Sequence, residues 1–471
     1  MEQVGPSPPS STARAFASLR AGALALLLLG LCGLGVAAPT PSQGASLAQA
    51  AWPSLQGGPE HPGAAIGGPA PPLRVLWRAT DSGDGRLSTP AVAPGAAVAT
   101  APAAVVGLDP RTGGVLWTLP RTPGPLIPPA VDPAEGLVVY AEGRTRAEGA
   151  LVAVDLRTRR RRWRVALGTV GAAGPTVAGG QVFVGTREGS LVALDLATGQ
   201  ERWRVQAGGA VDVAPAASDG LVVAVAEERE TGGITVLAAA TEGCGQPTCR
   251  PLWSFRPRRL GAGSTSPTVV GGTVYVGLGD FTVYALDLRD GRERWRAAVH
   301  GFFSPLSSPA VEGGGVYLQD RLGGVYGLDA GSGEQRWDFQ FRAGATWGAP
   351  LVVGGHLYVG LDDGTLAAIR TADGHLVWQA DLGPGPVGGL APAGEDHLLA
   401  PTIAVQGGVV ALGHDPAGAL VDLLSPTRLR PARALANFAA AAAALGLGLF
   451  VLFRFVAGRI PRGVPPPEGP R

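Results

Sequence analysis

Residues that commonly carry chemistry are few and scattered in this chain of 471 residues. The six histidines lack the spacing of metal ligands, and no C-x-x-C-H segment is present for haem attachment. No G-x-S-x-G segment marks a serine nucleophile. Gly383–Gly388 fits the dinucleotide pattern G-x-G-x-x-G only formally, because prolines interrupt it and no helix is expected after it. The sequence therefore predicts no catalytic, cofactor-binding or metal-binding residue. The histidines are His61, His300, His356, His375, His397 and His414.

Two of the three cysteines lie close together in a short insertion. Cys244 and Cys249 belong to Glu242–Arg250. We expect them to form a disulfide that closes a small loop, because disulfides persist in oxidising compartments and the chain ends predict export. A redox or metal role is the alternative, against which the lack of a third or fourth nearby ligand argues.

Tryptophan spacing reveals an internal repeat of about 43 residues. On an isolated four-stranded sheet each of these tryptophans would expose a large apolar face. We therefore predict that each packs against the neighbouring repeat and docks one blade of a propeller on the next. The residues are Trp77, Trp117, Trp163, Trp203, Trp253, Trp295, Trp337 and Trp378.

Each repeat reads as four short strands separated by turns. In the clearest unit, Pro175–Trp203, strands are expected near the proline and at 181–185, 191–194 and 201–205. Asp195–Gly199 predicts a turn, because aspartate accepts hydrogen bonds from nearby N–H groups and glycine adopts positive φ. The unit recurs at Pro267–Trp295, Pro309–Trp337 and Pro350–Trp378.

The number of repeats predicts an all-β fold, an eight-bladed β-propeller of four-stranded antiparallel blades over residues 73–415. Residues 73–78 carry a docking tryptophan without a unit before it, and residues 387–413 supply three strands without a closing tryptophan. We expect these two ends to build the last blade jointly, which closes the ring. Alternatively, residues 411–421 form a degenerate unit that competes for the same edge.

Glycine and proline are abundant, with 73 and 42 residues, yet 46% of the chain is hydrophobic. Much of the glycine and proline falls at the turns of the repeat, which predicts turns rather than disorder. The remainder, at 39–72 and 461–470, is expected to be loose chain. The formal net charge of +1 lacks the positive field that nucleic-acid binding requires, so no nucleic-acid partner is expected.

Both ends of the chain carry membrane signals. Arg14 and Arg20 precede an apolar run, and Ala48–Ala50 fits a cleavage site, so residues 1–50 predict a signal peptide and linker. An uncleaved anchor is the alternative. Ala434–Phe453 has the ~20 apolar residues that a membrane span needs. A removable sorting signal is the rival explanation.

These signals predict a single-pass protein of the cytoplasmic membrane with its propeller on the extracytoplasmic side. The other expected parts are an N-terminal extension at 51–72, a linker at 416–433, a transmembrane helix at 434–456 and a short Pro-rich tail at 457–471.

The segment Ala193–Trp203 resembles the docking motif of pyrroloquinoline-quinone-like (PQQ-like) propeller repeats. Trp52–Gly63 is similar to the Trp-Pro…Gly segment that often opens such exported domains. The family includes quinoprotein dehydrogenases, which bind the quinone and Ca²⁺, and cofactor-free members such as the lipoprotein that assists outer-membrane barrel assembly. Variants of the motif stand at Leu108–Trp117, Val154–Trp163, Leu286–Trp295, Leu328–Trp337 and Ile369–Trp378.

The resemblance implies a cofactor-free scaffold rather than an enzyme, because the adjacent Cys-Cys pair of the dehydrogenases is absent from this chain. We predict a non-enzymatic, membrane-anchored scaffold that binds proteins or peptides in envelope protein assembly. A PQQ-dependent oxidoreductase is the alternative. A sensor ectodomain is a third class, and the short tail after residue 454 argues against it.

One face of the predicted ring gathers aromatic and arginine side chains, which are enriched in protein interfaces. We predict that this face binds proteins or peptides at the cell envelope. Alternatively, Trp347 only plugs the channel mouth and the arginines are solvated. The partner-binding candidates are Trp347, Arg256, Arg258, Arg259, Phe302, Phe303, Asp320 and Arg321.

Overall fold

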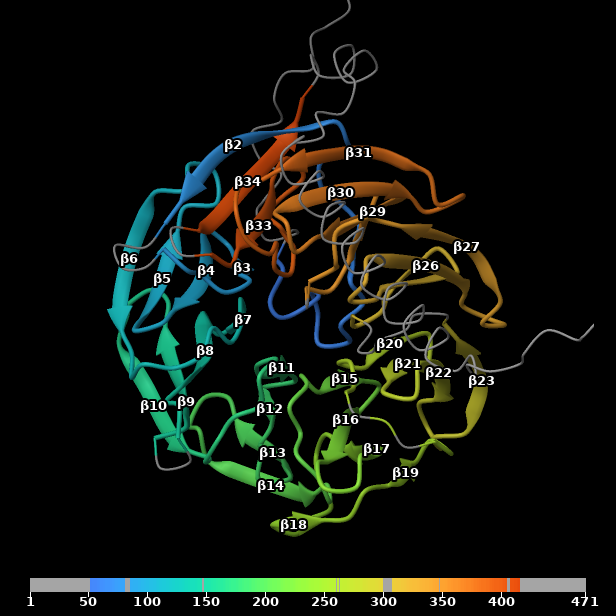
Figure 1. Cartoon of the computed structure of the whole chain (residues 1–471). Helices are drawn as coiled ribbons and strands as arrows, with labels where there is room; N and C mark the ends of the chain where they lie inside the picture. Colours follow the sequence, from blue (N-terminus) through green and yellow to red (C-terminus); the bar gives the residue numbers. More distant parts are fainter. Residues whose placement is uncertain are drawn as a thin grey trace, which may run out of the picture. The chain divides into compact units, whose positions relative to one another are not determined.

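The computed structural model describes one compact unit made of β-strands. The residues described are 51–80, 85–145, 148–259, 261, 263–299, 307–346, 348–404 and 407–415. Figure 1 shows their sheets arranged in a ring. The predicted signal peptide, linker, transmembrane helix and tail lie outside these residues. Within them, no helix is long and apolar enough to cross a membrane.

The ring has eight blades, and the four main strands of each blade run antiparallel from the inside outwards. Blade 1 is β3 (Ala91–Ala93), β4 (Ala96–Ala101), β5 (Ala104–Leu108) and β6 (Val115–Pro120). Blade 2 is β7 (Ala130–Asp132), β8 (Leu137–Glu142), β9 (Ala150–Asp155) and β10 (Arg161–Ala166). Blade 3 is β11 (Thr176–Ala178), β12 (Gln181–Gly185), β13 (Ser190–Asp195) and β14 (Glu201–Gln206). Blade 4 is β15 (Ala216–Ser218), β16 (Leu221–Glu228), β17 (Gly233–Ala240) and β19 (Trp253–Phe255).

The second half of the ring repeats the same order. Blade 5 is β20 (Thr268–Val270), β21 (Thr273–Leu278), β22 (Thr282–Asp287) and β23 (Glu293–Ala298). Blade 6 is β24 (Ala310–Glu312), β25 (Gly315–Gln319), β26 (Gly324–Asp329) and β27 (Gln335–Gln340). Blade 7 is β28 (Leu351–Val353), β29 (His356–Gly360), β30 (Thr365–Arg370) and β31 (Leu376–Asp381). Blade 8 is β32 (Ala391–Pro392), β33 (Leu398–Thr402), β34 (Gly408–His414) and β2 (Leu73–Ala79).

The predicted eight blades and their shared closing blade are confirmed. Strand β2 pairs antiparallel with β34, with Leu73 opposite His414, and β32 contacts β3 of blade 1. Residues 411–414 are therefore the end of a third strand rather than the start of another unit. Two blades exceed the four predicted strands, because β1 (Ala64–Ala65) pairs parallel with β28, and β18 (Thr248–Cys249) pairs parallel with β14.

Turn chemistry shapes the outer half of each blade, as blade 3 illustrates. The Asp195 Oδ1 atom accepts hydrogen bonds from the Thr198 N–H at 2.9 Å and from the Thr198 hydroxyl at 2.8 Å. Gly199 has φ +74°, and a Cβ there would lie 2.7 Å from the ring of Trp163 in blade 2. The turn therefore requires glycine both for its backbone and for the tryptophan of the preceding blade.

Five of the docking tryptophans also form a hydrogen bond to the next blade. In five blades the indole N–H donates to a carbonyl of the following blade at 2.8–2.9 Å. These bonds run from Trp163 to Leu196, Trp203 to Thr241, Trp253 to Leu288, Trp295 to Ala330 and Trp337 to Thr371. Each ring therefore buries apolar area and satisfies its one donor in the same contact.

The N-terminal segment runs through the middle of the ring, contrary to the expected loose chain (Figure 1). Inner strands present N–H groups toward the channel, and buried N–H groups need acceptors. The carbonyls of this segment supply them at 2.7–2.9 Å. The donors and acceptors are Val92 to Trp52, Val131 to Pro53, Ala217 to Pro59, Val269 to Glu60, Val311 to Pro62 and Val352 to Gly63. The expectation was wrong for residues 51–72 because composition does not report these long-range acceptors.

Close packing explains why the segment ends in glycine. Gly63 has φ +62°, and a Cβ there would come within 2.8 Å of the Ala310 Cβ in β24. Trp52, at the other end, is buried with its backbone bonded in both directions to Val92. The Trp52–Gly63 segment is therefore an internal plug whose two ends fit different blades.

His61 lies fully buried within this plug. Its Nε2 atom is 3.1 Å from the Thr176 hydroxyl, which itself donates to the Pro215 carbonyl at 2.6 Å. The imidazole must therefore donate from Nε2 to that hydroxyl. Desolvation lowers the pKa of His61 to about 4, while the Pro267 carbonyl, which favours the protonated ring, offsets part of the decrease. The buried imidazole is neutral at pH 7.

Replacing a docking tryptophan should destabilise the ring strongly. Trp203 is 1% exposed, and Trp203→Ala is expected to lower the free energy of unfolding by about 3–5 kcal/mol, since it leaves a cavity between blades 3 and 4. Chemical denaturation measures the change, with the exposed Gln206→Ala of the same strand as control. Equal, small effects of both variants would contradict the docking role.

The buried His61 should make stability fall in acid. Its pKa is about 4 in the folded protein and 6.5 in the unfolded chain, so the unfolded chain takes up the proton first as the pH falls. Stability is full above pH 6.5 and is lost between pH 6.5 and about 4. We expect this group to contribute about 2 kcal/mol of the loss between pH 7 and pH 5.

The matched variant His61→Gln separates this contribution from that of other groups. Its free energy of unfolding should change less between pH 7 and pH 5 than that of the native chain, by about the same 2 kcal/mol. Parallel pH profiles of the two proteins would show that His61 does not titrate in this way.

Candidate functional site

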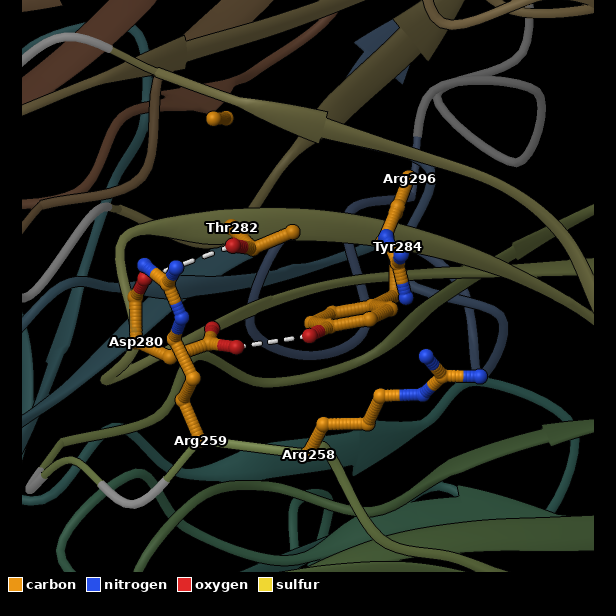
Figure 2. Close-up of a pocket in the computed structure, with 7 residues that line it drawn as sticks. Arg258, Arg259, Asp280, Thr282, Tyr284 and Arg296 are labelled. Atoms are coloured by element: carbon orange, nitrogen blue, oxygen red, sulfur yellow. Dashed lines mark hydrogen bonds between the residues drawn. The ribbon is translucent and has the colours of Figure 1, made fainter.

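A hollow lies where blades 4 and 5 meet. It measures about 530 Å³. Its lining comes from the loop after β19, from the hairpin between β21 and β22, and from β22 and β23 (Figure 2). The lining residues are Arg258, Arg259, Asp280, Thr282, Tyr284, Arg296 and Ala298.

Two predicted partner-binding residues, Arg258 and Arg259, form one wall of this pocket. Both are exposed, and neither guanidinium makes an ion pair or a hydrogen bond with another described residue. Figure 2 shows them reaching from one loop on either side of Tyr284. A third cation, Arg296, pairs at 3.6 Å with Glu293 of its own strand. The wall therefore offers two guanidinium groups to an incoming anion.

The floor of the pocket holds an aromatic side chain and a carboxylate in one hydrogen bond. The Tyr284 hydroxyl donates to the Asp280 Oδ2 atom at 2.6 Å, and the Tyr284 ring packs 5.2 Å from that of Phe255. Burial raises the pKa of Tyr284, and the hydrogen bond and negative charge of Asp280 raise it further. The hydroxyl thus stays protonated and keeps Asp280 in place. Three arginines and one aspartate leave the pocket positively charged.

The remaining predicted partner residues lie elsewhere. The Arg256 Nε atom donates to the Thr235 hydroxyl at 3.1 Å, and Arg321 is exposed on the hairpin between β25 and β26. Asp320 is buried, and its carboxylate accepts bonds from two hairpin N–H groups and from the Tyr326 hydroxyl. Asp320 is therefore not part of the candidate surface, because its carboxylate already accepts hydrogen bonds within its own blade. Trp347, Phe302 and Phe303 lie outside the described residues.

The sequence analysis missed Asp280, Tyr284 and Arg296 as pocket residues. An aspartate in the second hairpin that accepts from a tyrosine of the third strand occurs twice, as Asp280 with Tyr284 and as Asp320 with Tyr326. The spacing differs between the two pairs, because their hairpins differ in length. A search at one fixed spacing therefore finds only one of them.

The pocket belongs to a chain whose relatives are propellers. The sequence profile of a family described as outer membrane protein assembly factor BamB matches residues 147–303 and 243–437, which together span more than half of the chain. The chain belongs to the PQQ-like propeller family. No curated protein gave a significant sequence match.

Solved structures agree with the PQQ-like propeller fold. BamB from Moraxella catarrhalis is 21% identical over 72% of this chain and 99% of its own, with a TM-score of 0.56. The computationally designed Ika8 protein is 18% identical over 71% and 98%, with a TM-score of 0.57. A europium-containing methanol dehydrogenase is 14% identical over 75% and 89%, with a TM-score of 0.60. Identities this low show the fold alone.

The described residues do not fit the quinone and Ca²⁺ of the PQQ-like dehydrogenases. Within the part of the chain that the structure describes, no three His, Cys, Asp or Glu side chains are grouped to hold a cation. The Cys244 and Cys249 sulfur atoms are bonded to each other across a five-residue separation. Residues 52–65 also occupy the middle of the ring.

The disulfide closes the insertion that adds β18 to this PQQ-like propeller. The Cα atoms of Cys244 and Cys249 are 5.8 Å apart, and Cys249 lies opposite Val205 of β14. Without reductant, the intact chain should show no thiol from this pair, and reduction should add two hydrogen atoms to its mass. Reduction is also expected to lower the free energy of unfolding by about 2 kcal/mol, since the unfolded chain gains conformational entropy when its loop is no longer closed.

Cys244→Ser is the matched variant for this measurement. Its stability should not depend on reductant, whereas that of the native chain should. Free thiols at both Cys244 and Cys249 in the unreduced native chain would disprove the bond.

Proposed function

We propose that this protein is a non-enzymatic scaffold that binds proteins or peptides in envelope protein assembly. The observation that carries the proposal is the pair of exposed guanidinium groups, Arg258 and Arg259, without partners among the described residues, in a pocket of about 530 Å³ with an aromatic floor. Arginine and tyrosine dominate the energetics of protein interfaces. The family to which the profile belongs, described as an outer membrane protein assembly factor, supports the same class of function.

The chemistry of the pocket points to an acidic segment of the partner. A carboxylate can accept two parallel N–H bonds from one guanidinium, and two adjacent guanidinium groups suit neighbouring Asp or Glu residues. The Tyr284 ring and the stems of the arginines provide the apolar surface beside them. Asp280 alone would attract a basic segment, but the three arginines of the lining outweigh its single negative charge, so the pocket selects negative charge.

We further propose that the scaffold acts on the extracytoplasmic side of the cytoplasmic membrane, held by the apolar span at residues 434–456. The disulfide supports an oxidising compartment. Protease treatment of intact spheroplasts tests this location. Digestion of the propeller while the cell stays sealed is the expected result, and protection of the propeller would contradict it.

Reversing the charge of the pocket should abolish capture of partners. The full-length chain carrying Arg258→Glu and Arg259→Glu, purified in detergent from its own cells, is expected to recover at least about tenfold less of the proteins that co-purify with the native chain. Quantitative mass spectrometry of the co-purified proteins measures the loss.

The control for this experiment is Arg289→Glu. Arg289 is exposed in the turn between β22 and β23, at the opposite end of blade 5 from the pocket. This control should capture partners as the native chain does. Unchanged capture by the double variant would remove the pocket from the function.

The alternative is a PQQ-dependent oxidoreductase, for which the fold shared with a methanol dehydrogenase is the specific observation. Addition of PQQ with Ca²⁺ distinguishes the two functions. Quinone binding with dye reduction would favour the oxidoreductase, whereas the scaffold predicts neither.

A further inference from the structure

Three neighbouring blades carry exposed apolar pairs where four of the other five blades carry charge. Each pair stands directly before the docking tryptophan at the start of an outer strand, and its residues are 37–53% exposed. The pairs are Leu376-Val377 in blade 7, Val75-Leu76 in blade 8 and Val115-Leu116 in blade 1. We call these six residues the apolar rim. Figure 1 shows their strands β31, β2 and β6 following one another along the outer edge of the ring.

The same two positions are polar in four of the other blades. They hold Arg161-Arg162 in blade 2, Glu201-Arg202 in blade 3, Glu293-Arg294 in blade 5 and Gln335-Arg336 in blade 6. The arginine at the second position of each pair bonds to the aspartate of the preceding turn, as Arg202 does to Asp195. Blade 4 carries Pro251-Leu252, with Leu252 61% exposed, but this apolar pair stands alone because blades 3 and 5 on either side of it carry charge. Blade structure therefore does not require apolar residues at these positions, and their run over three consecutive blades needs another cause.

The exit point of the chain identifies what covers the apolar rim. The last described residue, Asp415, donates its N–H to the Pro72 carbonyl at 2.9 Å, beside the start of β2. The chain thus leaves from blade 8, the middle of the three blades, on its way to the apolar stretch Ala434–Phe453. Only eighteen residues, 416–433, separate Asp415 from that stretch, and a chain of this length spans roughly 60 Å at most when fully extended. Blades 7, 8 and 1 are therefore the part of the ring held closest to a bilayer that this stretch enters.

We propose that the apolar rim rests on the lipid surface, so that the ring stands on edge at the membrane. This inference rests on the membrane attachment in the proposed function. Leucine and valine side chains enter the boundary between headgroups and acyl chains, where their burial is favourable. The pocket between blades 4 and 5 then lies on the side of the ring opposite blades 8 and 1, and faces away from the membrane (Figure 1).

The test uses a fluorescent probe on the full-length chain in lipid vesicles. Leu116→Cys, carrying an environment-sensitive nitrobenzoxadiazole label, samples the apolar rim in blade 1. Arg294→Cys, at the same register position in blade 5 across the ring, is the matched control. Both variants also carry Cys32→Ser, so that only the introduced thiol reacts while the bond between Cys244 and Cys249 stays closed. Vesicles with and without brominated acyl chains report contact with lipid.

Contact with lipid should quench the rim probe alone. The label at position 116 is expected to lose at least about twofold of its emission in brominated vesicles, and the label at position 294 to lose none. Leu376→Cys, in blade 7, should behave like position 116. This second site covers the case in which one labelled variant fails to fold.

Three results would overturn the proposal. Unquenched probes on a chain that floats with the vesicles would leave the membrane anchor standing and remove only the rim contact. A chain that does not float with the vesicles would contradict both the membrane anchor and the rim contact. The scaffold function is tested separately, by capture of partners through Arg258 and Arg259. Blue-shifted emission at position 116 without quenching would show that a protein surface, such as a second copy of the chain, covers the rim.

Discussion

The ring depends on one repeated contact, the packing of a tryptophan from one blade against the next, and in six of the eight cases the indole ring lies over a turn glycine. A four-stranded blade has no second layer of its own, so this aromatic face finds cover only on a neighbour. At Trp163 the contact combines three constraints: the ring covers Gly199, the indole N–H reaches the Leu196 carbonyl, and the turn between them is closed by Asp195. Because every blade needs its neighbour, the last blade must be completed by β2, and the two ends of the propeller are joined.

The structural features that repeat along the chain, the blades and their turns, could be predicted from the sequence. The features that occur once, the plug and the pocket, could not. The period of the tryptophans, the Asp-x-x-Thr-Gly turns and the unmatched ends at residues 73–78 and 387–413 together led to eight blades and a shared closing blade. The plug, Trp52–Gly63, was not predicted, because its partners are single N–H groups on inner strands far along the chain. No local pattern in the sequence marks these groups. The pocket itself was not predicted, for the same reason, and only two of its lining residues were among the partner-binding candidates. Arg258 and Arg259 stand out as an arginine cluster, whereas Asp280 and Tyr284 join them only when blades 4 and 5 meet.

Filling the channel changes what the ring can do. The carbonyls of residues 52–63 bond inner strands of blades 1, 2, 4, 5, 6 and 7, and His61 reaches Thr176 of blade 3. The plug thereby ties together blades that do not touch each other, and it uses the hydrogen-bonding groups that a ligand in the middle of the ring would otherwise meet. Recognition is left to the outer surfaces, where a cationic pocket has formed between two blades.

The distribution of charge over the outer strands then orients the molecule. If every blade carried the arginine that pairs with its turn aspartate, as Arg202 and Arg294 do, the rim would be equally polar all round. Exchange of this arginine for Leu76, Leu116 and Val377 makes three adjacent blades apolar at this position, whereas Leu252 of blade 4 is a single exchange between two charged blades. Burial of those side chains is favourable against lipid, whereas the guanidinium groups of Arg258 and Arg259 gain most from a partner carboxylate in a pocket shielded from water. Two surfaces with opposite preferences on opposite sides of a rigid ring can be satisfied together only when the bilayer and the partner approach from opposite directions.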